Sequence, residues 1–116
     1  MLRKKGNHLG EFEEIVMLTI AVLQDEAYGL AIKKELEEQS KRKITISAVH
    51  AACNRLEEKG LLTAHFGEKS NQRGGKRKKI YAVSLKGQQA LYDAQELRMR
   101  LWKRIPRTGF QMDISW

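Results

Sequence analysis

The chain has 116 residues, enough for one small domain and too few for two, so an apolar face on a long helix would need a partner to cover it. Its net charge of +8 lies wholly in residues 61–116, which carry twelve Lys or Arg against four Asp or Glu, whereas residues 1–60 carry ten of each. This asymmetry favours a polyanionic partner, and the lone cysteine, Cys53, excludes an intrachain disulfide and is typical of a cytoplasmic protein.

An apolar run at residues 15–23 follows basic residues, as the core of a secretion signal does. Glu11, Glu13 and Glu14 interrupt the approach to it, and the polar residues 24–26 stand where a small-residue cleavage site would lie. A run of nine residues is also too short to span a bilayer. We therefore expect no secretion signal and no membrane partner.

Residues 9–24 carry apolar side chains at helical spacing and predict a first helix. Its apolar stripe comprises Leu9, Phe12, Ile15, Val16, Leu18, Ile20 and Leu23. Residues 24–27 form a short polar turn, and Tyr28-Gly29 opens a second helix. One face of this helix carries Tyr28, Ile32 and Leu36. Glu37 and Glu38 precede Lys41 and Arg42 by four residues, an order that favours ion pairs within a helix.

A third helix is predicted over residues 46–59, with Thr45 as its N-cap and Gly60 at its end. Its apolar stripe is Ile46, Val49, Cys53 and Leu56. The opposite face is small and polar, with Ser47, Ala48, His50, Ala51 and Asn54. Because short side chains allow close approach to a major groove, we expect Ser47, His50 and Asn54 to reach base edges.

Two strands follow, at residues 62–66 and 77–83, with Tyr81 and Val83 on one face of the second. The glycine-rich loop between them and the start of the second strand place five cations within seven residues: Arg73, Lys76, Arg77, Lys78 and Lys79. Such a hairpin suits phosphate contacts, although a solvated charged loop is the alternative. We expect six residues to contact phosphates: Lys43, Thr45, Arg73, Lys76, Arg77 and Lys78.

Ser84 caps a final helix that continues to Pro106 and is about 30 Å long. A body of this size cannot cover its apolar stripe, so pairing with a second copy is the simplest solution. The expected dimer interface is Leu91, Ala94, Leu97, Leu101, Trp102 and Ile105. Trp102 either packs in that interface or stacks on a ligand there.

Enzyme motifs are absent from the sequence. Gly74-Gly75-Lys76 lacks both the earlier glycine and the following Ser or Thr of a phosphate-binding loop. No zinc-binding spacing connects the histidines with Cys53, which lies on an apolar stripe. We therefore expect no catalytic residues, no metal and no cofactor.

The fold class is mainly α with a small β-hairpin. Residues 9–83 form a winged helix-turn-helix, residues 84–106 a long C-terminal dimerisation helix, and residues 107–116 a tail without periodicity, which is compatible with disorder. The pattern indicates a regulator that binds double-stranded DNA. An RNA-binding protein, or a protein-interaction module that uses the same basic surface, is the alternative.

Several stretches in this order resemble the PadR-type transcriptional regulators: Leu9–Glu13, Asp25–Gly29, Asn54–Leu61, Gly74–Lys78, and Tyr81 with Ser84 and Gly87. The resemblance covers residues 9–104 and implies a winged helix with a C-terminal dimerisation helix. Family members are commonly repressors, and some bind a small planar effector at the dimer interface. This chain departs in having Val49-His50 where the family usually has Leu-Tyr. It also has one C-terminal helix, as in the short subgroup.

Overall fold

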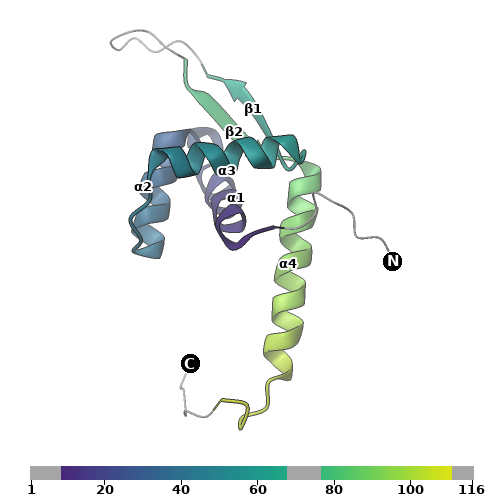
Figure 1. Cartoon of the computed structure of the whole chain (residues 1–116). Coiled ribbons are helices and arrows are strands. Elements are labelled where there is room, and N and C mark those ends of the chain that lie inside the picture. Colours follow the sequence, from purple (N-terminus) through teal and green to yellow (C-terminus); the bar gives the residue numbers. More distant parts are fainter. Residues whose placement is uncertain (1–8, 68–76, 111–116) are drawn as a thin grey trace.

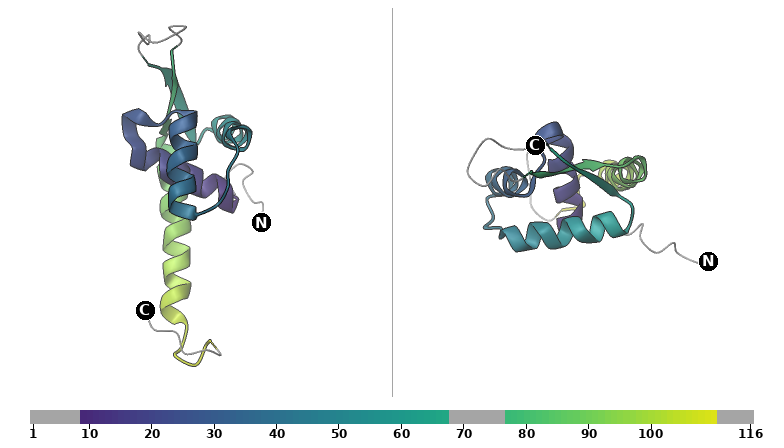
Figure 2. Two further views of the ribbon diagram at one scale, coloured as in Figure 1. Left: turned by 90° about the vertical axis from the view of Figure 1, so that its left-hand side faces the viewer. Right: turned by 90° about the horizontal axis from the view of Figure 1, so that it is seen from above.

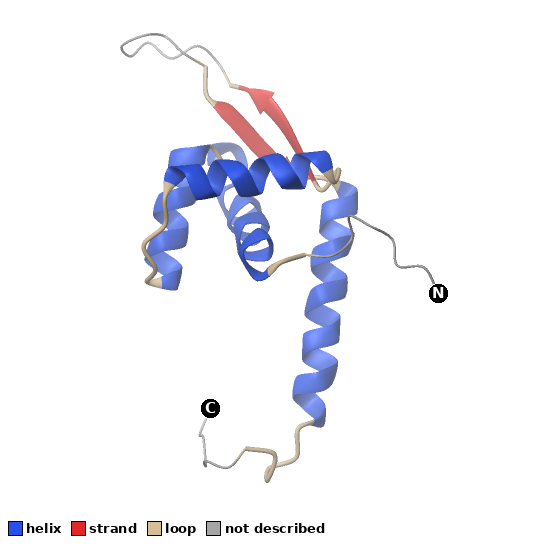
Figure 3. Cartoon of the chain, viewed as in Figure 1, coloured by secondary structure: helices blue, strands red, loops and turns tan. Residues whose placement is uncertain are grey.

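The computed structural model describes residues 9–67 and 77–110 and shows a helical body with a hairpin on one side and a long helix on the other (Figure 1). Its elements are α1 (Glu11–Leu23), the single 3-10 turn η1 (Gln24–Glu26), α2 (Gly29–Ser40), α3 (Ile46–Glu58), β1 (Leu62–Phe66), β2 (Lys79–Val83) and α4 (Leu85–Arg104). The mainly helical fold with a small antiparallel hairpin is therefore confirmed (Figure 3).

Helices α1, α2 and α3 share one apolar core, because each turns a stripe of buried side chains toward the other two. The largest fully buried side chains are Met17, Ile20, Ile32, Leu56, Leu61, Val16, Val49 and Cys53. The expected stripe of α1 was wrong at Leu18, which is 46% exposed, whereas Met17 and Thr19 beside it are buried. Helices α2 and α3 both pack against α1, and the exposure of Leu18 places it outside the buried face.

The ion pairs expected within α2 do not form. Helix α2 ends at Ser40, and Lys41 takes a left-handed backbone conformation with a φ of 59°, so Lys41 and Arg42 leave the helical spacing. Glu37 instead accepts hydrogen bonds from the Ile44 amide and from Lys33 Nζ, each at 3.0 Å. Arg42 pairs with Glu11 of α1, with 2.6 Å between Nη2 and Oε2.

Strands β1 and β2 pair antiparallel, with Ala64 opposite Tyr81 and Phe66 opposite Lys79. The segment after η1 lies on the other edge of β2, because the Tyr81 amide donates to the Ala27 carbonyl at 2.9 Å and Tyr28 bridges Ile80. Tyr81 is buried against the helices and Val83 is half-buried on the same face, as expected. The second strand begins at Lys79 rather than at residue 77.

Helix α4 begins at the N-cap Ser84, whose Oγ accepts from the Gly87 amide at 3.0 Å. Its first turns pack Ala90 and Leu91 against the core, and its remaining length extends past the body, away from the hairpin (Figure 2). Within the described ranges, no helix combines the length and the apolar character needed to cross a membrane.

Candidate nucleic-acid interface

The outward face of α3 carries three of the expected site residues, since Ser47, His50 and Asn54 are all exposed. They lie at i, i+3 and i+7, so they share one side of the helix. Thr45 caps the helix as expected, and its Oγ1 accepts from the Ala48 amide at 3.1 Å. The side chains thus lie on a rigid element whose opposite face is buried in the core.

Two lysines on this side of the molecule each contact a neighbouring aromatic or acidic side chain: Lys78, which directly precedes β2, and Lys79, the first residue of the strand. Lys78 Nζ lies 4.0 Å from the centroid of the Tyr28 ring, at the start of α2. Lys79 Nζ lies 3.0 Å from Glu57 Oε1 of α3 and 5.4 Å from the centroid of the Tyr81 ring. The hydrogen bond with Glu57 is the main cause of a raised pKa at Lys79.

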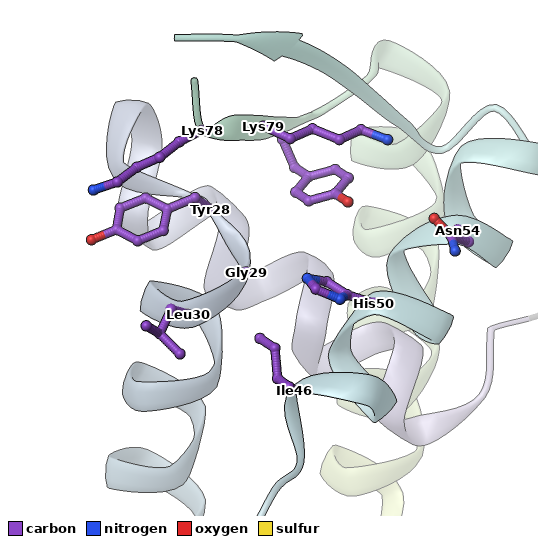
Figure 4. Close-up of a pocket in the computed structure, with 9 residues that line it drawn as sticks. Tyr28, Gly29, Leu30, Ile46, His50, Asn54, Lys78 and Lys79 are labelled. Carbon is purple, nitrogen blue, oxygen red and sulfur yellow. The ribbon is translucent and has the colours of Figure 1, made fainter. Parts of the chain in front are cut away.

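A cavity of about 610 Å³ opens between the start of α2, the outward face of α3 and β2. It is lined by Tyr28, Gly29, Leu30, Ile46, His50, Asn54, Lys78, Lys79 and Tyr81 (Figure 4). The His50 imidazole lies so close to Gly29 that an added Cβ there would be 2.7 Å from Nε2. The cavity is therefore lined by lysines on one side and by the polar face of α3 on the other.

Three expected site residues, His50, Asn54 and Lys78, line this cavity. The other described members of the set lie outside its lining, although all are exposed: Lys43, Thr45, Ser47 and Arg77. Arg73 and Lys76 fall outside the described residues. Tyr28 was not predicted as a site residue, because its spacing with Ile32 and Leu36 indicated only an apolar helix face. Its position directly before a helix was the available signal.

The apolar side chains on the distal half of α4 are open to solvent. Leu97 is 51% exposed, Leu101 59% and Trp102 48%, and Ile105, the C-cap residue after the helix, is 37% exposed. The Trp102 ring lies near that of Phe110, with 6.3 Å between centroids. Of the other residues expected in the dimer interface, Leu91 packs against the core of its own chain and Ala94 is half-buried.

Two buried glutamates of α1 form ion pairs with residues of α3 and α4 or next to them. The Glu13 carboxylate lies 2.9 Å from both Arg55 Nε and Lys59 Nζ, at the end of α3. Glu14 pairs with Arg98 of α4. The sequence showed these glutamates only as an interruption before an apolar run, and their burial was not predicted.

Cys53 is fully buried in the core. Burial, together with the nearby Glu57 carboxylate, raises the pKa of its thiol from 9.0 to about 12, so the thiol stays protonated and unreactive. Among the described residues, no three His, Cys, Asp or Glu side chains gather where they could hold a metal ion.

A family model described as the transcriptional regulator PadR-like family matches residues 17–93. RosR of H. salinarum, in the complex hsRosR-S4, is 26% identical, with 85% of this chain and 78% of that chain covered and a TM-score of 0.63.

Two further solved structures match. A PadR-family transcriptional regulator from Eggerthella lenta is 26% identical, with 80% of each chain covered and a TM-score of 0.61. A PadR-like transcription factor from Bacteroides fragilis, at 24% identity, shares the fold with a TM-score of 0.64, and 79% of this chain and 84% of that one are covered. No curated protein matches the chain.

Proposed function

The chain belongs to the PadR-like family of transcriptional regulators, and on this basis we propose that it is a homodimeric repressor that binds double-stranded DNA at a two-fold symmetric operator. The observation that carries the proposal is the cavity between α2, α3 and β2. Its lining combines the polar, exposed face of a helix with two lysines held by neighbouring side chains. Duplex DNA offers both a groove for such a helix and phosphates for such cations.

In this proposal α3 enters the major groove and turns Ser47, His50 and Asn54 toward base edges. Phosphate contacts flank the helix on both sides. They come from Lys43 and Thr45 before α3, and from Arg77 and Lys78 directly before β2. Arg73 and Lys76 of the loop between the strands complete the set on sequence grounds. Each phosphate contact adds about 0.9 to the salt dependence of binding.

Dimerisation through α4 would present two copies of α3 to successive major grooves. The support is the exposed apolar stripe formed by Leu97, Leu101 and Trp102 on the half of α4 that extends past the body, and by Ile105 at its C-cap. Burial of this stripe against a second copy would remove it from water and would add to the smaller contributions of Leu91 and Ala94. The half-sites would then lie ~10 base pairs apart, or a multiple of that.

The proposal includes a small planar effector at the dimer interface, and it rests there on one residue. Trp102 is 48% exposed and forms part of the stripe that a second copy would cover, so its ring could stack on a flat ligand between the two helices. We also place the protein in the cytoplasm, in contact with the DNA that it regulates.

The decisive measurement is fluorescence anisotropy with the duplex upstream of the protein's own gene, against a random duplex, at two salt concentrations. We expect the upstream duplex to bind more tightly by ~10³ or more. Equal, weak and strongly salt-dependent binding to both would contradict an operator in that region and would favour the protein-interaction module. Stronger competition by RNA than by duplex DNA would favour the RNA-binding alternative. Repression itself is tested by expression from the upstream region with and without the protein.

A further inference from the structure

Tyr28 lies at the junction of three elements that surround the cavity. It is the N-cap of α2, it directly follows η1 and Ala27, and its backbone bridges Ile80 of β2. Two residues before Ile80, and directly before β2 begins, Lys78 places its ammonium over the Tyr28 ring, 4.0 Å from the centroid. Because the backbone fixes ring and strand together, this contact is built into the fold.

Two neighbouring lysines are held in different ways: Lys78, which directly precedes β2, and Lys79, the first residue of the strand. Lys79 runs toward α3 and forms an ion pair with Glu57 at 3.0 Å, whereas Lys78 runs the opposite way, over Tyr28 (Figure 4). Lys78 forms no ion pair within the part of the chain that the structure describes. A carboxylate partner fixes a lysine but cancels its charge, while an aromatic face fixes it and leaves the charge unneutralised.

We propose that Tyr28 is a positioning residue for DNA binding, whose ring holds the Lys78 ammonium at the edge of the cavity so that it meets a backbone phosphate. A free lysine side chain loses rotamer freedom when it binds a phosphate, and the ring removes part of that cost beforehand. The inference rests on the proposed function and deepens it, because it explains why the cation next to Lys79 is held without a carboxylate.

A double-mutant cycle tests the coupling between the two side chains. The variants are Tyr28→Leu, Lys78→Met and their combination, with Tyr28→Phe to keep the ring and Lys34→Met to remove an exposed lysine of α2 that lies outside the cavity lining. Affinity for the duplex upstream of the protein's own gene is measured by anisotropy over a series of salt concentrations. Circular dichroism melting of each variant accompanies the titrations.

We expect Tyr28→Leu to weaken binding roughly two- to fivefold for each protomer that contacts DNA. Tyr28→Phe should bind as the wild type does. Lys78→Met should weaken binding and lower the salt slope by about 0.9 for each phosphate that Lys78 neutralises in the wild-type complex. In the Lys78→Met background, Tyr28→Leu should have no further effect, and Lys34→Met should change affinity less than Lys78→Met does.

Additive losses from Tyr28→Leu and Lys78→Met would overturn the proposal, and so would an equal loss from Tyr28→Phe, which would assign the effect to the hydroxyl. A wild-type protein that binds no duplex would remove the proposed function itself. NMR of the free protein provides a readout that does not depend on DNA. The Lys78 side-chain methylene protons should show an upfield ring shift that Tyr28→Phe keeps and Tyr28→Leu abolishes, and an absent shift in the wild type would also overturn the inference.

Discussion

Glu13 of α1 and Lys59, which follows α3, form an ion pair of 2.9 Å although they lie 46 residues apart in the chain. The same carboxylate accepts from Arg55 Nε, and the Glu13 side chain is only 9% exposed. The pair therefore links the end of α3, the helix proposed to enter the major groove, to α1. The next residue of α1, Glu14, forms an ion pair with Arg98 and so links α4 to α1.

Glu13→Gln should lower the free energy of unfolding by about 1–2 kcal/mol, because the amide keeps one acceptor oxygen and its NH2 group would face one of the two cations that the carboxylate binds. Urea denaturation at neutral pH measures the change. Glu38→Gln is the matched control, since Glu38 is exposed on α2 and its replacement should shift stability by less than about 0.5 kcal/mol. Equal effects of the two substitutions would show that the contacts of Glu13 contribute little.

The stabilisation from Glu13 should disappear in acid. Burial raises the pKa of this carboxyl, but hydrogen bonds from Lys59, Arg55 and the Gly10 amide outweigh burial and hold the pKa below its ordinary value of 4.5. A carboxyl with a lowered pKa in the folded state stabilises fully above the unfolded pKa and loses this effect as the pH falls through the folded pKa.

The stability difference between the wild type and Glu13→Gln should therefore be constant above pH 4.5 and shrink below it. Urea denaturation of both proteins over a series of pH values gives the difference directly. A difference that stays the same or grows on acidification would contradict the assigned ion pairs.

The sequence predicted the elements of this fold well where the signal was local. The apolar period of residues 46–59 indicated both the length of α3 and the face that remains outside, and a cap residue marked its start. Glu13 and Glu14 were beyond such reasoning, because their partners are 42 to 84 residues away and only the packed fold brings them together. Lys41 was missed for a different reason, since nothing in its residue type signals a left-handed conformation.

The same contrast holds for the candidate site. Ser47, His50 and Asn54 were predicted from their spacing along one helix; the structure leaves them exposed, and their role in DNA binding stays a prediction. Tyr28 was interpreted as part of an apolar stripe, because the strand that brings Lys78 onto its ring lies 50 residues further along the chain. Pairings between strand and helix carry no periodic signal, so contacts of this kind appear only in the folded chain.

Gly87→Ala should destabilise the protein although alanine favours helices. An added Cβ would collide with the Leu61 carbonyl oxygen and lie 2.8 Å from Val83 Cγ1. Relative to glycine, alanine raises the intrinsic stability of a helix by about 1 kcal/mol. Overpacking costs about 1–3 kcal/mol or more, and here the added Cβ would meet a backbone oxygen that has little freedom to move. We expect a lower melting temperature by circular dichroism. Gln95→Ala, at an exposed position of α4, should leave it unchanged or raise it, and an unchanged Gly87→Ala protein would refute the close approach.

Base reading and phosphate binding should separate in two variants. Asn54→Ala should reduce the preference for the operator over random duplex by about tenfold, since one side-chain contact to a base edge contributes about 1–3 kcal/mol of discrimination. Lys76→Ala combined with Arg77→Ala should weaken binding to every duplex and flatten the salt slope by about 0.9 for each phosphate left without its cation. If the double variant bound the operator as tightly as the wild type at every salt concentration, the phosphate assignment of this loop would be wrong.

Leu101→Glu should abolish the proposed dimer while leaving each protomer folded. Leu101 is 59% exposed in the single chain, so a carboxylate there costs the fold little, but a second copy of α4 would bury it in an apolar stripe. We expect the dissociation constant of the dimer to rise at least about a hundredfold, which corresponds to about 2.7 kcal/mol. Sedimentation over a range of concentrations gives this constant. Operator affinity should fall with it, because two linked recognition helices bind more tightly than one.

Lys103→Glu is the control for this prediction, since position 103 lies on the side of α4 opposite Leu101 and the substitution changes charge even more strongly. It should leave the dimer intact. A wild-type chain that sediments as a monomer at all concentrations would refute dimerisation through α4. Dimers that tolerate Leu101→Glu would instead place the interface elsewhere, with exposed Leu18 and Val22 of α1 as the next apolar surface to test.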